Sequence, residues 1–350
     1  MQNYNSIDLC KFICSLLVVA IHIPFMAPVD VYGVSYDFFR HVIARVAVPF
    51  FFVASGFFLY KKFNLYNISL DVVKKYVMKI FQLYVVWSVI YLPINFLDYS
   101  QNNRSALIDV VSYLRKFFLI GSYLHLWYLQ ATIVAVVLLT FLLYRCRSIR
   151  KIATLVSILY LIGVLGNSWY GLIAPVKNEF PLFAEIVKVY RMIFCSTNNG
   201  LFEGLFFVFM GMFFAHFPLS LSLKKSIVCF IVSLLLLVVE YVFVVNMKYA
   251  RGYDLYFSLV PTIFFGFLIV KKCKLNNGPI YFMMRKISTL IFLSHMLIYN
   301  IVVYVMSFLN LKLGWRWESY VATVVFSVIF SISILKLSNV TFFSFLKRGF

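Results

Sequence analysis

The sequence predicts an all-α protein, a polytopic membrane helix bundle of about ten transmembrane helices with both termini in the cytoplasm. Of its residues 63% are hydrophobic and only 13% are charged, whereas a soluble domain usually carries about 25% charged residues. Apolar runs long enough to cross a hydrocarbon core of about 30 Å recur along the chain. These two observations exclude a soluble protein and place the chain in a lipid bilayer.

Ten apolar runs give the predicted transmembrane helices, and residues 1–350 are predicted to form one integral membrane domain. The segment 105–120 is amphipathic and basic at its end, so we expect it to lie along the outer interface. The longest connection, residues 169–199, is expected to form a small structured cap over one face. The predicted helices lie near residues 7–27, 41–60, 78–97, 125–144, 152–168, 200–217, 227–246, 255–270, 287–309 and 317–337.

The distribution of positive charge sets the predicted orientation. The net charge is +20, and Lys and Arg are concentrated in alternate loops. Placing those loops and both termini in the cytoplasm follows the positive-inside rule. The same clusters face the anionic leaflet of a bacterial inner membrane, so the charge does not indicate nucleic-acid binding.

The six cysteines predict no disulfide framework and no metal site. None of them forms a CxxC pair, and Cys10 and Cys14 lie one turn apart inside the first apolar run. Buried free thiols are the expected state of such residues.

Ionisable side chains at membrane depth are costly to bury and are therefore candidates for function. His22, Arg45, His125 and Glu203 are predicted to share one depth in the outer half of the membrane, which suggests one polar cavity opening outward. A histidine can transfer protons near neutral pH, and either Asp37 or Glu203 could orient His22. Alternatively, the four residues could be separate groups at the membrane interface that share no cavity. This alternative applies most to His125, because it stands at a helix end.

A second cluster of charges is predicted at the cytoplasmic face. Lys75 and Lys79 share one face of the third helix, and Asp8 and Lys11 lie near the same level on the first helix. Each lysine alone is explained by anchoring at the positive inner side. Together with the intramembrane Lys11, the pair could bind a phosphorylated cytoplasmic ligand.

His295 lies near the middle of the ninth predicted helix, beside Ser294. Neighbouring residues on a helix point to different faces, so the two do not form a catalytic dyad. We expect His295 to make a hydrogen bond between helices.

Several segments resemble the acyltransferase-three family of integral membrane acyltransferases. Their order and spacing in a ten-helix setting carry the resemblance, since each is mostly apolar. The chain is similar to the membrane half of vancomycin-resistance serine racemases. The segments are SIDLCKFICSLLVVAIHIPF with Lys11 and His22, ARVAVPFFFVASGFFLYKK with Arg45, HLWYL at 125–129, GLFEGLFFVFMGM at 200–212 and ISTLIFLSHMLI at 287–298.

The resemblance implies transmembrane O-acetylation. Acetyl-CoA, the acyl donor, would dock from the cytoplasm with its phosphates near Lys11, Lys75 and Lys79, and its thioester would approach His22. An outward-facing hydroxyl acceptor, most often a cell-envelope saccharide, would take the acetyl group. Arg45 or His125 would stabilise the developing oxyanion. In members with arginines after the second helix, the resemblance implies that this basic segment handles the acyl donor. This chain has KKYVMK there, and lysine lacks the planar fork of donors with which arginine binds phosphate in a bidentate manner.

Two other functions remain open from the sequence. A solute or amino-acid transporter could use the same buried charges to bind substrate and couple protons. The chain shows no internal repeat and no paired broken helices of the kind many transporters contain. A non-catalytic partner or anchor for an envelope enzyme would not require His22.

Overall fold

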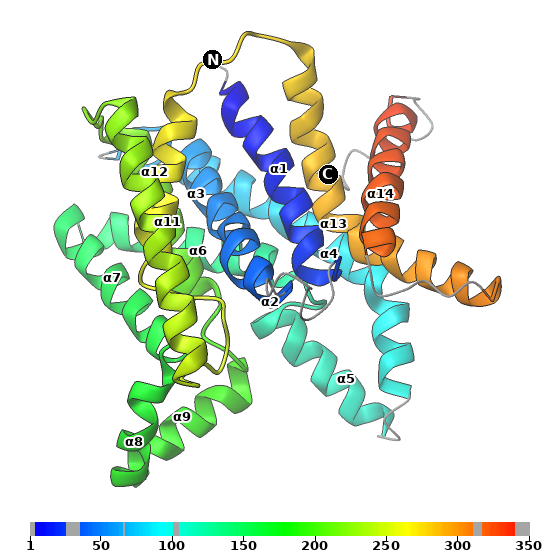
Figure 1. Ribbon diagram of the computed structural model, residues 1–350, viewed down its shortest axis with the longest axis horizontal. Coiled ribbons are helices and arrows are strands. Elements are labelled where there is room, and N and C mark those ends of the chain that lie inside the picture. Colours follow the sequence, from blue (N-terminus) through cyan, green and yellow to red (C-terminus); the bar gives the residue numbers. More distant parts are fainter. Residues whose placement is uncertain are drawn as a thin grey trace. The chain divides into compact units, whose positions relative to one another are not determined.

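The computed structural model describes residues 4–25, 36–65, 67–100, 105–146, 148–310 and 317–339, and these residues are almost entirely helical (Figure 1). The helices form two compact units. The first contains residues 1–51 and 267–350, and the second contains residues 52–266. Each unit is described by itself. The helices α3, Ala47–Tyr60, and α12, Leu259–Lys272, each contribute residues to both units.

The first unit is built on a long helix pair. Helix α1 (Asn5–His22) packs against α13 (Pro279–Phe308), and α13 also packs against α14 (Trp317–Leu337) (Figure 1). Val19, Ile23, Ile287 and Ile291 form the buried core of this pair. Apolar residues spaced three or four apart lie on one helix face, so these positions meet when α1 and α13 pack side by side. The unit also contains α2 (Tyr36–Phe38), η1 (Phe39–Ile43) and η2 (Ala44–Val46).

The second unit contains the larger set of helices. Helix α6 packs against α4, α10 and η4, and α7 packs against α8, α10 and η4. The helices are α4 (Leu70–Ser100), α5 (Ala106–Arg115), η3 (Lys116–Ile120), α6 (Trp127–Arg145), α7 (Ile149–Leu165), α8 (Tyr170–Glu179), α9 (Pro181–Phe194), η4 (Gly200–Gly204), α10 (Leu205–His216) and α11 (Leu223–Asn246).

Glycine lets two helices of the second unit approach closely. A Cβ at Gly56 of α3 would collide with the carbonyl oxygen of Val208 in α10, and a Cβ at Gly211 would collide with that of Val53. Both contacts are with backbone, which cannot move aside as a side chain can. The glycines in VASGFF and FVFMGM therefore set the α3–α10 distance.

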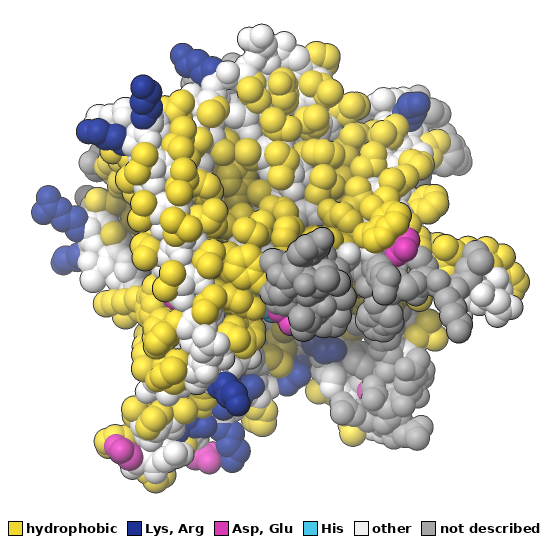
Figure 2. Space-filling model, viewed as in Figure 1, with side chains coloured by type: hydrophobic (Ala, Val, Ile, Leu, Met, Phe, Trp, Pro, Cys, Tyr) yellow, Lys and Arg dark blue, Asp and Glu magenta, His cyan; other side chains and the backbone are white. Residues whose placement is uncertain are grey.

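Each predicted transmembrane range overlaps a helix of the structure, which confirms the all-α membrane fold. Within the described part of the chain, seven helices are long and apolar enough to span a membrane, or eight if α7 and α8, bent by 81°, count as one span. Helix α10 with η4 forms a shorter apolar helix. Large hydrophobic residues are exposed along α11, where Figure 2 shows a hydrophobic surface. The number ten and the cytoplasmic termini stay predictions.

The second predicted span is less regular than expected. It begins at Tyr36 and passes through a π-helical turn, η1, and a 3₁₀ turn, η2, before α3 begins. Pro49 supplies a reason, because its ring opposes an α-helical carbonyl at Arg45. Such irregular turns are frequent at functional sites, and this one contains Arg45.

The two connections predicted to have structure are helical. The segment 105–120 forms α5 and η3. The cap at 169–199 forms α8 and α9, which pack against each other. A side chain joins the two regions, since the Arg115 guanidinium donates a 2.6 Å hydrogen bond to the backbone carbonyl of Met192.

Candidate active site

Two histidines meet in the first unit. His22 ends α1, and His295 lies in the buried middle of α13. Their ring centroids are 5.4 Å apart, and the ring planes differ by 31°. The packing of α1 on α13 produces this pair although 272 residues separate the two positions in the sequence.

The His295 ring is oriented by its own helix. Its Nδ1 lies 2.8 Å from the carbonyl oxygen of Phe292 and 3.1 Å from that of Ile291. Carbonyl oxygens only accept hydrogen bonds, so Nδ1 carries a proton and donates it. In the neutral ring Nε2 is then the basic nitrogen. The expected helix-to-helix hydrogen bond is thus replaced at Nδ1 by bonds within α13.

Two arginines accompany the histidine pair. Turn η2, which contains Arg45, packs against α1, and Arg45 is only 4% exposed. Arg40 of η1 and Arg45 both lie within electrostatic reach of His22. Arg45 was predicted to share a depth with His22, and this common depth in the membrane stays a prediction. Arg40 was not predicted, because it appeared to belong to a loop.

Asp37, one of the two carboxylates considered as a partner of His22, is largely exposed. Its side chain is 59% exposed and stands 4.0 Å from the Nε2 of His41, one turn along the same segment. Its role beside His22 stays a prediction. The sequence left Asp37 and Glu203 open as the partner of His22, and in the structure the ring of His295 contacts the ring of His22.

The opposite end of α1 carries its own charges. Asp8 forms a 3.6 Å ion pair with Arg285 of α13, and Lys11 lies within electrostatic reach of Asp8. Nearby, the Asn5 amide donates to the carbonyl of Asn276 over 3.1 Å. Asp8 therefore joins α1 to α13, and Arg285 adds a cation that the sequence analysis did not assign.

In the second unit, Glu203 is fully buried in the π-helical turn η4. This turn packs tightly on α6, where a Cβ at Gly200 would come within 2.6 Å of the Ala131 carbonyl oxygen. Tyr160 lies within electrostatic reach of Glu203 and donates a 2.8 Å hydrogen bond to the Tyr256 carbonyl. Glu203 thus occupies a rigid site inside the unit.

His125 is also buried in the second unit, with 1% exposure. Its ring packs in T-shaped geometry against the rings of Tyr91 and Tyr123, with ring centroids 5.2 Å and 5.9 Å away. The preceding loop is fixed to α4 by the Ser122 hydroxyl, 2.6 Å from the Ser88 hydroxyl. Because His125 and Glu203 belong to a different unit from His22 and Arg45, one shared cavity stays a prediction.

Glu240, which lies on α11, has a structural role. Its carboxylate accepts hydrogen bonds from the Trp169 indole at 2.6 Å, the Phe257 amide at 2.8 Å and the Ser258 amide at 2.7 Å. The two amides precede α12, so the carboxylate satisfies donors at the start of this helix.

Lys75 and Lys79 are exposed on α4 in the second unit. Among the described residues, no group of three or more His, Cys, Asp or Glu side chains could hold a metal ion.

Comparison with known proteins decides the family. A family model described as an acyltransferase domain matches residues 4–336, which include every predicted site residue. The chain belongs to the acyltransferase-three family. It is therefore a membrane acyltransferase by family, and the resemblance seen in the sequence is confirmed.

The relatives of this acyltransferase-three protein include longer proteins. It is 32% identical over 252 residues to an amino-acid racemase of Enterococcus faecalis, covering 70% of the chain and 32% of that protein. It is 30% identical over 273 residues to a serine/alanine racemase of Enterococcus gallinarum, covering 77% of the chain and 37% of that protein. The chain thus spans about a third of the length of these curated relatives. No solved structure matches it significantly.

Proposed function

We propose that this acyltransferase-three protein is a transmembrane O-acetyltransferase of the bacterial inner membrane. It would take the acetyl group from cytoplasmic acetyl-CoA and transfer it to a hydroxyl of an extracytoplasmic acceptor, a cell-envelope saccharide. The observation that supports this proposal best is the His22–His295 pair with Arg45 and Arg40 in electrostatic reach. Acyl transfer needs a proton acceptor and a positive charge in one place, and these residues supply both.

His22 would act as the general base. As the acceptor oxygen bonds to the thioester carbonyl carbon, its proton passes to His22, and the carbon–sulfur bond breaks. The proton then passes to the leaving thiolate, which restores neutral His22. The Arg45 guanidinium can stabilise the oxyanion that forms on the carbonyl. His295 would fix the position of the His22 ring.

Cations at the start of α1 and α13 support the donor side of the proposal. Lys11 and Arg285 flank Asp8, and guanidinium and ammonium groups bind phosphate strongly. Lys75 and Lys79, exposed on α4, are further candidates for contact with the donor phosphates. In the first unit, Lys11 and His22 stand on one uninterrupted helix, so phosphate and thioester groups would bind at different levels.

The test measures thiol release from acetyl-CoA by the purified full chain, with an envelope saccharide as acceptor. We expect His22→Ala to lower turnover by about 100-fold or more, because general bases contribute about 10²–10⁴-fold. His216→Ala is the matched control, since His216 lies at the end of α10 and bonds to the Tyr60 carbonyl. Its turnover per folded molecule should stay close to that of the unmodified protein.

Two results would count against the proposal. Turnover of His22→Ala above about a tenth of the unmodified rate would exclude a general base at this position. If the unmodified protein releases no thiol but carries amino acids into proteoliposomes, the transporter alternative is supported instead.

A further inference from the structure

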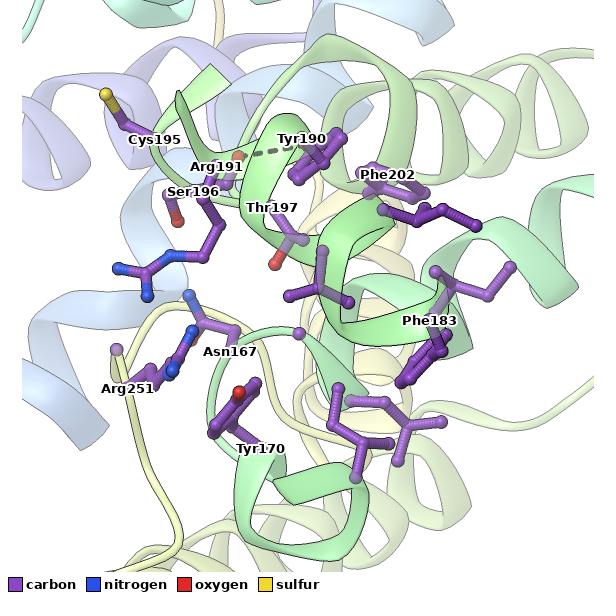
Figure 3. A pocket seen from close by; sticks show the side chains of 17 residues that line it. Asn167, Tyr170, Phe183, Tyr190, Arg191, Cys195, Ser196, Thr197, Phe202 and Arg251 are labelled. Carbon is purple, nitrogen blue, oxygen red and sulfur yellow. Dashed lines mark hydrogen bonds between the residues drawn. The ribbon is translucent and has the colours of Figure 1, made fainter. Parts of the chain in front are cut away.

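A pocket of about 500 Å³ lies in the second unit where α7 ends, lined by α8, α9 and the loops that follow α7, α9 and α11 (Figure 3). Its volume falls within the range of small-molecule sites, about 300–1,000 Å³. One side is apolar and is formed by side chains from α7, α8 and α9. The apolar lining includes Ile162, Leu165, Ile173, Phe183, Ile186 and Val187.

The other side of the pocket is cationic. Arg191 comes from α9, and Arg251 comes from the loop after α11. Figure 3 shows the amide of Asn167 beside these two guanidinium groups, with Phe183 on the opposite side. The Arg251 guanidinium stacks 3.5 Å above the centroid of the Tyr170 ring, which holds its plane in place.

The two guanidinium groups reinforce each other's positive field. Burial lowers the pKa of Arg251 from its ordinary value, Tyr170 acts in the opposite sense, and the charge of Arg191 adds a smaller lowering effect. Neither arginine forms an ion pair with a carboxylate within the described part of the chain. Burial raises the pKa of the lining Tyr190 to about 12, so this phenol stays neutral and does not offset the charge.

The pocket walls are fixed by hydrogen bonds. The Arg251 amide donates to the carbonyl of Asn167 over 3.0 Å, and the Asn167 side-chain oxygen accepts from the Asp254 amide at 2.9 Å. On the facing side, the Thr197 hydroxyl donates to the Gly163 carbonyl at 2.8 Å. A preformed site loses little conformational freedom when a ligand binds.

We propose that this pocket binds an amphipathic anion, a molecule with an apolar moiety that carries a phosphate or carboxylate group. The apolar wall would receive the hydrophobic part, and the two arginines would hold the oxyanion, which guanidinium groups match in geometry. Helix α9 also exposes Leu182, Val189 and Met192, which lie outside the pocket lining, so a ligand could enter from the membrane interface. The inference does not depend on the proposed acetyl transfer.

Binding is tested by isothermal titration of the full chain in phosphatidylcholine nanodiscs. The probes are octyl phosphate, inorganic phosphate and octyl glucoside. We expect saturable binding of octyl phosphate, weakened about tenfold or more in Arg191→Gln and in Arg251→Gln, because each variant removes a charged hydrogen-bond donor to the oxyanion. The matched control is Lys188→Gln, which removes a cation of α9 that pairs with Glu185 outside the pocket lining. It should leave the affinity unchanged.

Each probe can overturn part of the proposal. If octyl glucoside binds as tightly as octyl phosphate, the ligand does not need an anionic group. If inorganic phosphate binds as tightly as octyl phosphate, the ligand does not need an apolar moiety. No loss of affinity in either arginine variant would overturn the site itself. Repeating the titration in nanodiscs with phosphatidylglycerol distinguishes two sources of ligand. Competition there identifies a lipid headgroup as the occupant, and unchanged affinity identifies a dissolved amphiphile.

Discussion

His295 illustrates how a buried side chain can be oriented before any substrate binds. Two backbone carbonyls fix the Nδ1 proton, so the ring turns its basic edge away from its own helix. We expect His295→Ala to lower kcat about tenfold or more while KM for the donor stays the same, since the ring would position His22 and not touch donor phosphates.

The pH profile separates this positioning role from a purely structural one. Loss of His295 should move the pH dependence of kcat, because the environment of His22 changes. A folded variant with lower kcat and an unshifted profile would contradict it. His295→Asn is the companion variant, since its amide N–H can still donate to a carbonyl of α13.

Arg45 provides a second test that concerns a single residue. Arg45→Lys keeps the charge and loses the planar fork of donors. We expect normal folding and about a tenfold or larger loss of kcat, as for removal of one oxyanion donor. Thermal unfolding and steady-state kinetics together check this. Near-normal kcat would mean that Arg45 contributes only charge.

Glu240 is expected to affect stability and not chemistry. Glu240→Ala would leave the Trp169 indole and the amides of Phe257 and Ser258 without their acceptor. Buried donors without partners cost about 1–3 kcal/mol each, so a clear drop in thermal unfolding temperature should follow. Glu179→Ala, at the exposed end of α8, is the matched control. An equal drop in both variants would contradict the structural role.

At the scale of elements, the apolar runs were sufficient to locate the helices. Every predicted range overlaps an observed helix because crossing a membrane requires about 20 apolar residues in succession. The irregular turns were not predicted. The hydropathy of a segment depends on its composition and not on whether its turns are α-, π- or 3₁₀-helical. Hydropathy therefore does not reveal η1, η2 or η4. Pro49 was the one local signal available.

The close contact between α3 and α10 at two glycines predicts how substitutions there change stability. Gly56→Ala and Gly211→Ala each add a Cβ that collides with backbone, and overpacking costs about 1–3 kcal/mol or more. We expect lower yield of folded protein and a lower unfolding temperature. Gly278→Ala is the control, because its nearest contact atoms would be 3.8 Å away. Unchanged stability of all three variants would show that the helices can separate without cost.

For the whole molecule, native cysteines offer a test of orientation. Cys146, Cys195 and Cys273 are exposed, and the charge pattern places Cys195 outside and the other two inside. In right-side-out vesicles, a membrane-impermeant maleimide should label Cys195 alone. Single-cysteine variants identify the labelled position, and permeabilised vesicles show that all three thiols can react. Labelling of Cys146 and Cys273 but not Cys195 would reverse the predicted topology.

The candidate site was only partly accessible to sequence reasoning. His22 and Arg45 were found because an ionisable group inside a membrane is rare and costly. His295 and Arg285 gain their importance from the packing of α13 on α1, a contact between distant segments. The pocket at Arg191 and Arg251 was missed for a similar reason, since its cationic side combines Arg191 of α9 with Arg251 of the loop after α11, two segments far apart in sequence.

The unbroken course of α1 has a consequence for substrate length. Asp8 and His22 are 14 residues apart on one helix, so the rise of about 1.5 Å per residue sets them about 21 Å apart. The helix therefore fixes the distance between the end that would bind the donor phosphates and the end that would receive the thioester. A truncated donor, acetyl-pantetheine, would still reach His22 but could not engage Lys11 or Arg285. It should therefore react with a raised KM and a kcat close to that of the full donor.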